Sequence, residues 1–346
     1  MDIRWVPAKP IDVLRVSGFL QTSADRNHFA NGGPCVKRLE KELVTILDIL
    51  PTKRVIATTN GAAALHALIA GLSIAKGRNI SLATQAFTFP ASAQGPLRGS
   101  TIVDIDEQGG PDLNQVPKDI DGLVVTNVFG HVTPLDKYVQ WAQGKYLILD
   151  NAACPLSYYR GVNSLNYGTG SIVSFHHTKP LGFGEGGAVI VDAEYEPYVR
   201  RAICFGYGTE QVWNEWSSNW KMSDPAAAYI LSHLYSTKEI QQKHIRGYEY
   251  IEERLPADVR LLPHAGESLF ASCIPVLFPT PISLPQTKIE IKKYYRPLVS
   301  RPVSDDWYNR ILCFPLTTDM NQPEYDLILE TICACLSLAQ AATPKW

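Results

Sequence analysis

The residue with the clearest chemical potential is Lys179, which follows a short apolar run and a polar turn. The run over 172–175 has strand character, four glycines lie within 182–187, and a β-branched run follows over 188–191. Burial or a nearby cation lowers a lysine pKa from about 10.4, so this amine is suited to form a Schiff base with an aldehyde cofactor. Spacing alone leaves a second interpretation open, in which the lysine only caps a turn at a strand end.

A second feature is the segment 58–66, Thr-Thr-Asn-Gly-Ala-Ala-Ala-Leu-His, which follows a predicted strand and opens a predicted helix. Unpaired N–H groups and the positive end of the helix dipole bind anions at such a position. Gly61, Ala62 and Ala63 are therefore candidate phosphate ligands. An ordinary strand-to-helix turn is the other interpretation.

A third feature is Asp150, which ends the apolar run over 146–150. A carboxylate in this position can keep the nitrogen of an aromatic ring protonated through a charge-assisted hydrogen bond, and the ring then accepts electrons. The alternative is an aspartate that only caps the turn over 151–153.

The run Ser174-Phe-His-His-Thr-Lys179, with Gly184-Glu-Gly-Gly187 after it, resembles the signature of the nucleotide-sugar aminotransferases. These enzymes are the DegT/StrS family of fold-type I pyridoxal-phosphate (PLP) enzymes. The resemblance implies that PLP is the cofactor, that Lys179 holds it as a Schiff base, and that Ser174 binds its phosphate. Further matches follow in the expected order along nearly the whole chain, and we expect no metal site.

The resemblance also assigns Gly61 and Ala62 to the cofactor phosphate. The family motif here is Gly-Thr-x-Ala-Leu, so Ala62 replaces a hydroxyl residue. The missing side-chain hydrogen bond to a charged group is worth about 1.5–3 kcal/mol. We therefore expect backbone donors, including that of Ala63, and Ser174 to contribute more of the phosphate binding.

Asp150 aligns with the family aspartate that faces the pyridine nitrogen, because its spacing to Gly161 and Lys179 then fits without a gap. The other registration would place Asn151 at the nitrogen. A polar residue that the family usually carries three positions later is Ala153 here, so its hydrogen bond to the ring hydroxyl is absent.

The resemblance places Phe89 on the outer face of the cofactor ring and leaves Phe87 in the core. Both could equally be core residues, since aromatic side chains at strand ends usually are. His176 and His177 precede the lysine, where a histidine can relay protons. We assign His177 to substrate binding, although a packed structural histidine explains each of them as well.

The run Asn219-Trp-Lys221-Met resembles the family motif Asn-Tyr-Arg-Met, whose asparagine and basic residue reach the partner subunit's cofactor phosphate and substrate. Lys221 replaces the arginine, so a bidentate contact becomes a point charge. A solvated loop is the alternative, but three tryptophans near this motif favour a buried interface. They are Trp213, Trp216 and Trp220. We expect a homodimer with composite active sites.

The resemblance implies a transaminase that takes an amino group from L-glutamate, releases 2-oxoglutarate, and transfers the group to a nucleotide-linked keto-sugar. Lys179 would move the proton as general base and acid. The motif over 176–185 resembles the branch that aminates C-4 of a dTDP-4-keto-6-deoxyhexose to give a 4-amino-4,6-dideoxyhexose.

Four alternatives stay open. They are a 3-keto-sugar aminotransferase, a PLP-dependent sugar dehydratase on the same fold, a fold-type I lyase acting on amino acids, and a non-catalytic binding protein. The dehydratases carry histidine in place of the lysine, and the lyase would need an arginine for the substrate carboxylate. Intact Lys179, Asp150 and Ser174 argue against a non-catalytic role.

These residues need a sheet to bring them together, and the apolar pattern predicts one. Strands are expected over 54–57, 80–83, 101–105, 123–126, 146–150 and 172–175, and helices over 36–50, 61–75 and 134–142. Such alternation indicates an α/β fold with a mostly parallel sheet, which binds ligands at the carboxyl ends of its strands. By resemblance this is the fold-type I PLP aminotransferase fold, a large domain with a helix-flanked central sheet and a small C-terminal α+β domain.

The pattern changes after Ser223, where a capping serine, an acid and a proline predict a helix start. Helical sequence continues to about residue 255. Strands are expected over 269–278 and 289–295, and a last helix over 323–341. We expect a large PLP-binding domain over 1–240 and the small domain over 241–346.

The bulk composition excludes some classes of protein. The net charge of −2 in 346 residues predicts no nucleic-acid partner. No apolar run is long enough to predict a membrane span, and the N-terminal residues lack the pattern of a secretory signal. Seven scattered cysteines favour a reducing compartment, so we expect a cytoplasmic protein.

Overall fold

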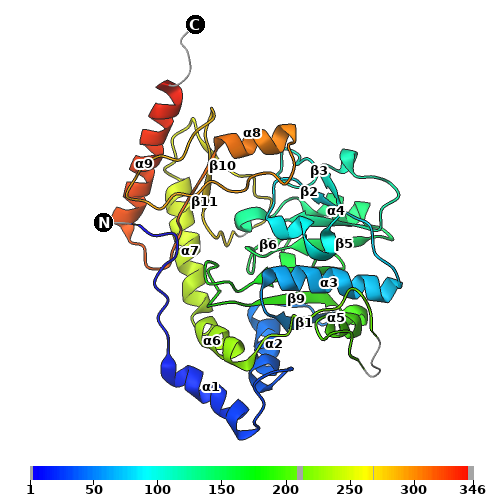
Figure 1. Cartoon of the computed structure of the whole chain (residues 1–346). Coiled ribbons are helices and arrows are strands. Elements are labelled where there is room, and N and C mark those ends of the chain that lie inside the picture. The colour runs from blue at the N-terminus through cyan, green and yellow to red at the C-terminus, as the bar shows by residue number, and fades with distance from the viewer. Residues whose placement is uncertain (1–2, 209–212, 268, 342–346) are drawn as a thin grey trace.

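The centre of the molecule is a seven-stranded sheet with the strand order β1-β9-β8-β5-β4-β2-β3. The computed structural model describes residues 3–208, 213–267 and 269–341 (Figure 1). Strand β9 is antiparallel to both its neighbours, and every other pair is parallel, which confirms the mostly parallel sheet. The strands are β1 (Lys53–Thr58), β2 (Leu82–Gln85), β3 (Thr101–Val103), β4 (Gly122–Thr126), β5 (Tyr146–Asp150), β8 (Gly170–Ser174) and β9 (Gly187–Asp192).

Helices cover both faces of this sheet, because successive residues of each strand point to opposite faces and both sets are apolar. On one face, α3 (Gly61–Lys76) and α5 (Glu196–Ala202) pack on the strands through residues such as Leu68 and Val199. On the other face lie α2 (Pro34–Ile46), α4 (Leu135–Trp141) and α6 (Asp224–Leu234). Helix α1 (Val13–Asp25) packs outside α2 and α6, and β6 (Tyr158–Tyr159) pairs with β7 (Val162–Asn163).

The C-terminal third forms a second core around a three-stranded antiparallel sheet, β10-β11-β12. Its elements are α7 (Thr237–Glu252), β10 (Arg260–Leu261), β11 (Ile274–Leu277), α8 (Pro302–Arg310), β12 (Ile311–Phe314) and α9 (Gln322–Ala341). The beginning of the chain joins this core, since Ile3 is buried in it and bridges to Ile289. Figure 1 shows the N-terminal segment beside α7. The expected domain boundary after residue 240 lies inside α7 and stays a prediction.

The predicted strand over 289–295 is wrong. This segment makes two isolated bridges, Ile289 with Ile3 and Lys292 with Cys313, and no continuous ladder. Its charged side chains stay at least partly exposed. Lys292 pairs with Glu290 inside the segment, and Lys293 donates to carbonyls outside it. The strand predicted over 269–278 is confirmed only for 274–277, and the one over 80–83 lies two residues later.

Two properties of the whole chain bear on its environment. Within the described ranges no helix combines the length and the apolar character needed to cross a membrane. All seven cysteines are free thiols.

Candidate active site

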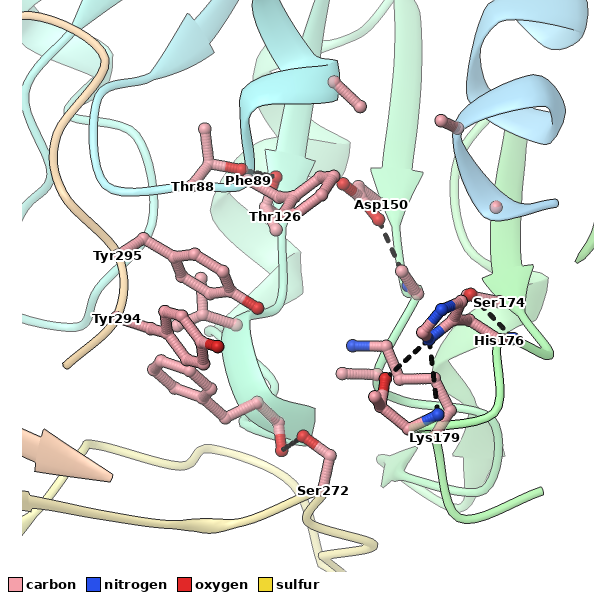
Figure 2. Close-up of a pocket in the computed structure, with 18 of the residues that line it drawn as sticks. Thr88, Phe89, Thr126, Asp150, Ser174, His176, Lys179, Ser272, Tyr294 and Tyr295 are labelled. Atoms are coloured by element: carbon pink, nitrogen blue, oxygen red, sulfur yellow. Dashed lines mark hydrogen bonds between the residues drawn. The ribbon is translucent and has the colours of Figure 1, made fainter. Parts of the chain in front are cut away.

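The carboxyl ends of the central strands open into a cavity of about 970 Å³. Residues at the ends of three neighbouring parallel strands line it: Thr126 of β4, Asp150 of β5 and Ser174 of β8. Lys179 lines the same cavity from the turn after β8. Figure 2 shows Asp150, Ser174 and Lys179 together, with Tyr294 and Tyr295 across from them. The sheet therefore brings together the three residues that the sequence singled out for chemistry.

The turn that carries Lys179 is tight and closed by backbone hydrogen bonds. The N–H of Lys179 donates to the carbonyl of His176 (2.8 Å), and that of Gly182 donates to the carbonyl of Lys179 (2.9 Å). A Cβ on Gly182 would lie 1.9 Å from the carbonyl oxygen of His176, so no other residue fits there. The His176 side chain lies 3.5 Å from Glu185, which supports the turn from its far end.

Lys179 and Asp150 influence each other's charge. Burial lowers the pKa of Lys179, while the charge of Asp150 opposes that shift. Burial also raises the pKa of Asp150, which the N–H of Ala152 and the charge of Lys179 oppose. Among the described residues no hydrogen bond or salt bridge holds the Lys179 amine. The amine is therefore less basic than an exposed lysine and free to react.

The structure separates Asp150 from Asn151. Asp150 lines the cavity, and its Oδ1 accepts a hydrogen bond from the N–H of Ala152 (3.1 Å). Asn151 is fully buried away from the cavity, with its Oδ1 bound to the side-chain amide of Asn127 (2.6 Å). Of the two, only Asp150 can meet a ligand in this cavity.

An anion cradle lies where α3 begins. Gly61 starts the helix so close to Ser174 that an added Cβ would lie 2.7 Å from the serine Cβ. The N–H groups of Gly61 and Ala62 have no acceptor among the described residues, and both residues line the cavity with Ser174. The N–H of Ala63 is bound by the Asn60 side chain (2.8 Å), so the expectation that it is a free donor is wrong.

Phe89 and Phe87 lie in different environments. Phe89 is 53% exposed and lines the cavity, whereas Phe87 is completely buried. The buried Gln85 side chain shapes this loop, because it donates to the carbonyl of Phe87 (3.0 Å) and accepts from the N–H of Thr126 (3.0 Å). Phe89 thus faces the cavity, as the resemblance implies.

Three predicted site residues do not line this cavity. His177 is not in the cavity wall; its ring packs edge-on against Phe183, and His176 takes the lining position. Asn219 and Lys221 lie outside this cavity, where the Lys221 amine donates to the Asn219 side chain (2.7 Å). Their assignment to a site shared with a second subunit stays a prediction.

The sequence reasoning missed the wall that faces the sheet. It consists of Trp5 and the segment 290–296, including Tyr294, Tyr295 and Arg296. Tyr295 stacks on Phe129 (5.0 Å between ring centroids) and meets Phe89 edge-on. The adjacent tyrosines and the basic residues around them are a usable signal of a binding surface, but the apolar pattern of this segment predicts a strand instead.

The cavity fits PLP in three independent ways. A close glycine contact and free N–H groups suit a phosphate, a buried carboxylate suits a protonated ring nitrogen, and an unpaired amine suits the aldehyde. Asp150 is buried without a cation in hydrogen-bond contact, so a positive charge against it would stabilise its carboxylate.

Comparisons with known proteins agree with this geometry. The curated relatives include a dTDP-4-amino-4,6-dideoxy-D-glucose transaminase of Shigella dysenteriae, 24% identical over 91% of this chain and 94% of the relative. A UDP-4-amino-4,6-dideoxy-N-acetyl-beta-L-altrosamine transaminase of Campylobacter jejuni is also 24% identical, over 91% of this chain and 93% of its own length.

Solved structures share the fold over almost the whole chain. DesI, studied in the presence of its TDP-sugar product, superposes with a TM-score of 0.83 at 21% identity and covers 98% of this chain and 94% of its own. A 3-amino-5-hydroxybenzoic acid synthase gives a TM-score of 0.81 at 16% identity, over 96% of this chain and 99% of its own.

The family model of the DegT/DnrJ/EryC1/StrS aminotransferases matches residues 17–333, which include every residue of the cavity described above except Trp5 and Val6. The chain therefore belongs to the DegT/DnrJ/EryC1/StrS aminotransferase family of PLP-dependent sugar transaminases.

Proposed function

We propose that this aminotransferase moves an amino group from L-glutamate to C-4 of a dTDP-4-keto-6-deoxyhexose, giving a 4-amino-4,6-dideoxyhexose. The observation that carries the proposal is the shared cavity of the Lys179 amine, the Asp150 carboxylate and the anion cradle at Ser174. The names of the Shigella and Campylobacter relatives, both transaminases of nucleotide-linked 4-amino-4,6-dideoxy sugars, support the sugar class and the C-4 position. The TDP-sugar of DesI supports the dTDP group.

In this proposal each residue of the sheet wall has one task. PLP, when bound, supplies an electron-accepting ring that stabilises negative charge on the reacting carbon. Asp150 holds the proton on the ring nitrogen. Lys179 takes and returns the proton at its Nζ, and burial, which lowers the pKa of this amine, favours its unprotonated form. Ser174 and the N–H groups of Gly61 and Ala62 bind the cofactor phosphate.

The mouth of the cavity offers a contact for the anionic groups of the substrates. Arg296 lines the cavity, is exposed, and has no hydrogen-bond or ion-pair partner among the described residues. By contrast, Lys292 is paired with Glu290, and the Lys293 amine donates to three carbonyls, including those of Ile282 and Asn309. We assign Arg296 to the diphosphate of the nucleotide sugar.

We further propose that the active enzyme is a homodimer in which Asn219 and Lys221 reach the partner's cavity. Both residues lie outside the cavity of their own chain, and exposed aromatic side chains lie near them in the sequence. Trp213 is 81% exposed and Phe205 is 54% exposed, which an interface would cover. The seven free thiols support a reducing compartment such as the cytoplasm.

The test is an absorbance spectrum of the protein with PLP, before and after L-glutamate, with Lys179→Ala in parallel. We expect a band near the visible edge that L-glutamate bleaches in the wild type and that the variant never forms. Candidate keto-sugars are then scored by recovery of the band. The proposal fails if no amino donor changes the band, and its C-4 dTDP part fails if only 3-keto sugars, or only UDP- or GDP-linked sugars, restore it.

A further inference from the structure

The segment before α1 runs from the C-terminal core, which contains Ile3, to the turn that carries Lys179, which Lys9 contacts. The N–H of Trp5 donates to Glu290 (2.8 Å), and the Trp5 ring meets Tyr294 edge-on, so this arm is attached to the cavity mouth. Four residues later, Lys9 reaches the turn itself. We refer to residues 3–9 as the N-terminal arm.

Lys9 is held by the backbone of the catalytic turn. Its Nζ donates to the carbonyl of Lys179 (2.6 Å) and to that of Gly182 (2.5 Å). These carbonyls bound the turn that presents the Lys179 side chain, since the N–H of Gly182 also donates to the carbonyl of Lys179. Lys9 thus connects the two ends of the turn over 179–182 through their carbonyls, while Lys179 itself lines the cavity.

A second element completes this support. The Nε2 of His233, in the last turn of α6, donates to the carbonyl of Pro180 (3.1 Å). Three carbonyls of the turn, those of Lys179, Pro180 and Gly182, are therefore bound by side chains from outside it. Residues of the arm and of the turn, among them Trp5, Lys9 and Lys179, line one small pocket together with His233.

The surroundings of Lys9 contain no carboxylate partner among the described residues. Burial lowers the pKa of Lys9 to about 8. The titratable groups that face it are His177, His233 and His244, and burial together with the Lys9 charge lowers the pKa of each. Lys9 is partly buried, and its two hydrogen bonds to carbonyls are the contacts that offset the desolvation of its amine.

We propose that Lys9 is a positioning residue that fixes the catalytic turn and thereby makes the N-terminal arm part of the active site. The inference rests on the role proposed for Lys179, but its geometry does not depend on which sugar is the substrate. Lys9 acts through the turn, because its amine binds the backbone and not the cavity.

The chain offers a matched control in Lys145. Its Nζ also donates to two backbone carbonyls, those of Lys118 and Ile120, each at 2.6 Å. Lys145 precedes β5, so it lies at the end of that strand opposite to Asp150. Lys145→Met removes the same kind of contact without touching the cavity.

The test compares Lys9→Met, Lys9→Arg and Lys145→Met by amide hydrogen exchange of the full-length protein. We expect Lys9→Met to speed exchange over 176–184 by about tenfold or more, because two charge-assisted hydrogen bonds are lost. Lys9→Arg should restore much of the protection, and Lys145→Met should leave this segment unchanged. Uniformly faster exchange along the chain, or no change over 176–184, would overturn the proposal.

A second readout uses bound PLP and L-glutamate. For Lys9→Met we expect kcat to fall by about tenfold or more with KM for the sugar unchanged, and the pH midpoint of the PLP absorbance band to shift. An unchanged kcat and an unchanged midpoint would overturn the proposal. Failure of the proposed function is distinguishable, because it would show in Lys179→Ala and leave the exchange result intact.

Discussion

The two walls of the cavity are built from different kinds of structure. The sheet wall places Asp150 and Ser174 at the buried ends of paired strands, with Gly61 packed closely against Ser174. The opposite wall, Trp5 and the segment 290–296, is joined to its surroundings by isolated bridges and aromatic contacts. The groups assigned to the chemistry thus occupy rigid positions, whereas the groups assigned to recognition lie on a segment without a ladder.

This difference suggests how the family's fold accommodates different substrates. Solved structures at 16–21% identity share this fold although their names specify different products. A wall without regular strand pairing can change sequence at little cost in backbone hydrogen bonds, whereas the sheet wall cannot. Variants on the sheet wall should therefore lower the rate of the reaction, whereas variants on the opposite wall should weaken substrate binding.

The largest effect is expected for Lys179→Ala on the sheet wall. Loss of the proton-transferring amine should lower the rate of the L-glutamate half-reaction by about 10²–10⁴-fold. Single-turnover absorbance measurements with bound PLP check this, with Lys145→Met as the control for loss of a distant lysine. A variant that keeps more than a tenth of the wild-type rate would show that Lys179 is not the proton carrier.

The second-largest loss of rate is expected for Asp150→Asn. It keeps the shape but removes the charge at a buried position, and a hydrogen bond to a charged group is worth about 1.5–3 kcal/mol, or about 10–150-fold in rate. The measurement is kcat with L-glutamate, together with the spectrum of bound PLP. Asp104→Asn provides the comparison, since Asp104 is equally buried but binds Ser304 outside the cavity. Equal losses in both variants would point to folding and not to the site.

Gly61→Ala tests the cradle on the same wall. The new Cβ would lie 2.7 Å from that of Ser174, so we expect PLP affinity to fall by about tenfold. Gly18→Ala is the matched control, because it lies in α1 with nothing within 4 Å and should stabilise the helix by about 0.5–1 kcal/mol. Titration of both variants with PLP decides the matter, and an unchanged affinity in Gly61→Ala would exclude the cradle.

On the opposite wall, formed by Trp5 and the segment 290–296, Arg296→Gln should affect substrate binding and leave the chemical step unchanged. We expect KM for the nucleotide sugar to rise by about tenfold, with little change in the L-glutamate half-reaction. Steady-state kinetics at two salt concentrations measure both, since a lost charge contact also weakens the salt dependence. If the L-glutamate half-reaction slows instead, Arg296 binds the amino donor and our assignment is wrong.

The smallest effect is expected for the pH dependence of stability, which depends on two buried histidines that contact the C-terminal core. Burial lowers the pKa of His131 to about 3 and that of His244 to about 4, and their Nδ1 atoms donate to the carbonyls of Leu262 and Ala271. Between these folded-state pKa values and the pKa of about 6.5 in the unfolded chain, the unfolded chain binds more protons. The contribution of the neutral histidines to the free energy of unfolding is therefore fully present above about pH 6.5 and is lost as pH falls below it.

Urea unfolding at pH 7 and pH 5 measures that loss, and hydrogen exchange locates it. We expect the C-terminal core to open before the central sheet, and His244→Gln to reduce the pH dependence. Loosening of the sheet first would contradict the contrast between the two walls.

The sequence predicted the sheet wall well because its signals are local. Apolar runs over 146–150 and 172–175 correspond to β5 and β8, and the residue that ends β5 faces the cavity as expected. The capping serine at 223 begins α6 as predicted, with its hydroxyl accepting from the N–H of Ala226. The choice between Asp150 and Asn151 needed the structure, because adjacent residues at a strand end point in opposite directions.

The mouth was not predictable in the same way. Tyr294, Tyr295 and Arg296 reach the cavity because the chain meets β12 at one isolated bridge, Lys292 with Cys313, which no local sequence pattern encodes. The same holds for Lys9, whose partners are 170 and 173 residues away in the chain. The sequence analysis assigns His177 to the site, whereas His176 lines the cavity. Only the fold of the turn decides which of these two rings meets the cavity.

By itself, the sequence predicted the strands of the central sheet, most helix starts and the candidate reactive groups that follow them, because short-range apolar periodicity and capping depend on adjacent residues. Tertiary structure alone decided which segment closes the cavity and which lysine supports the catalytic turn. Those outcomes depend on contacts between distant parts of the chain, and such contacts form only when the two cores pack against each other.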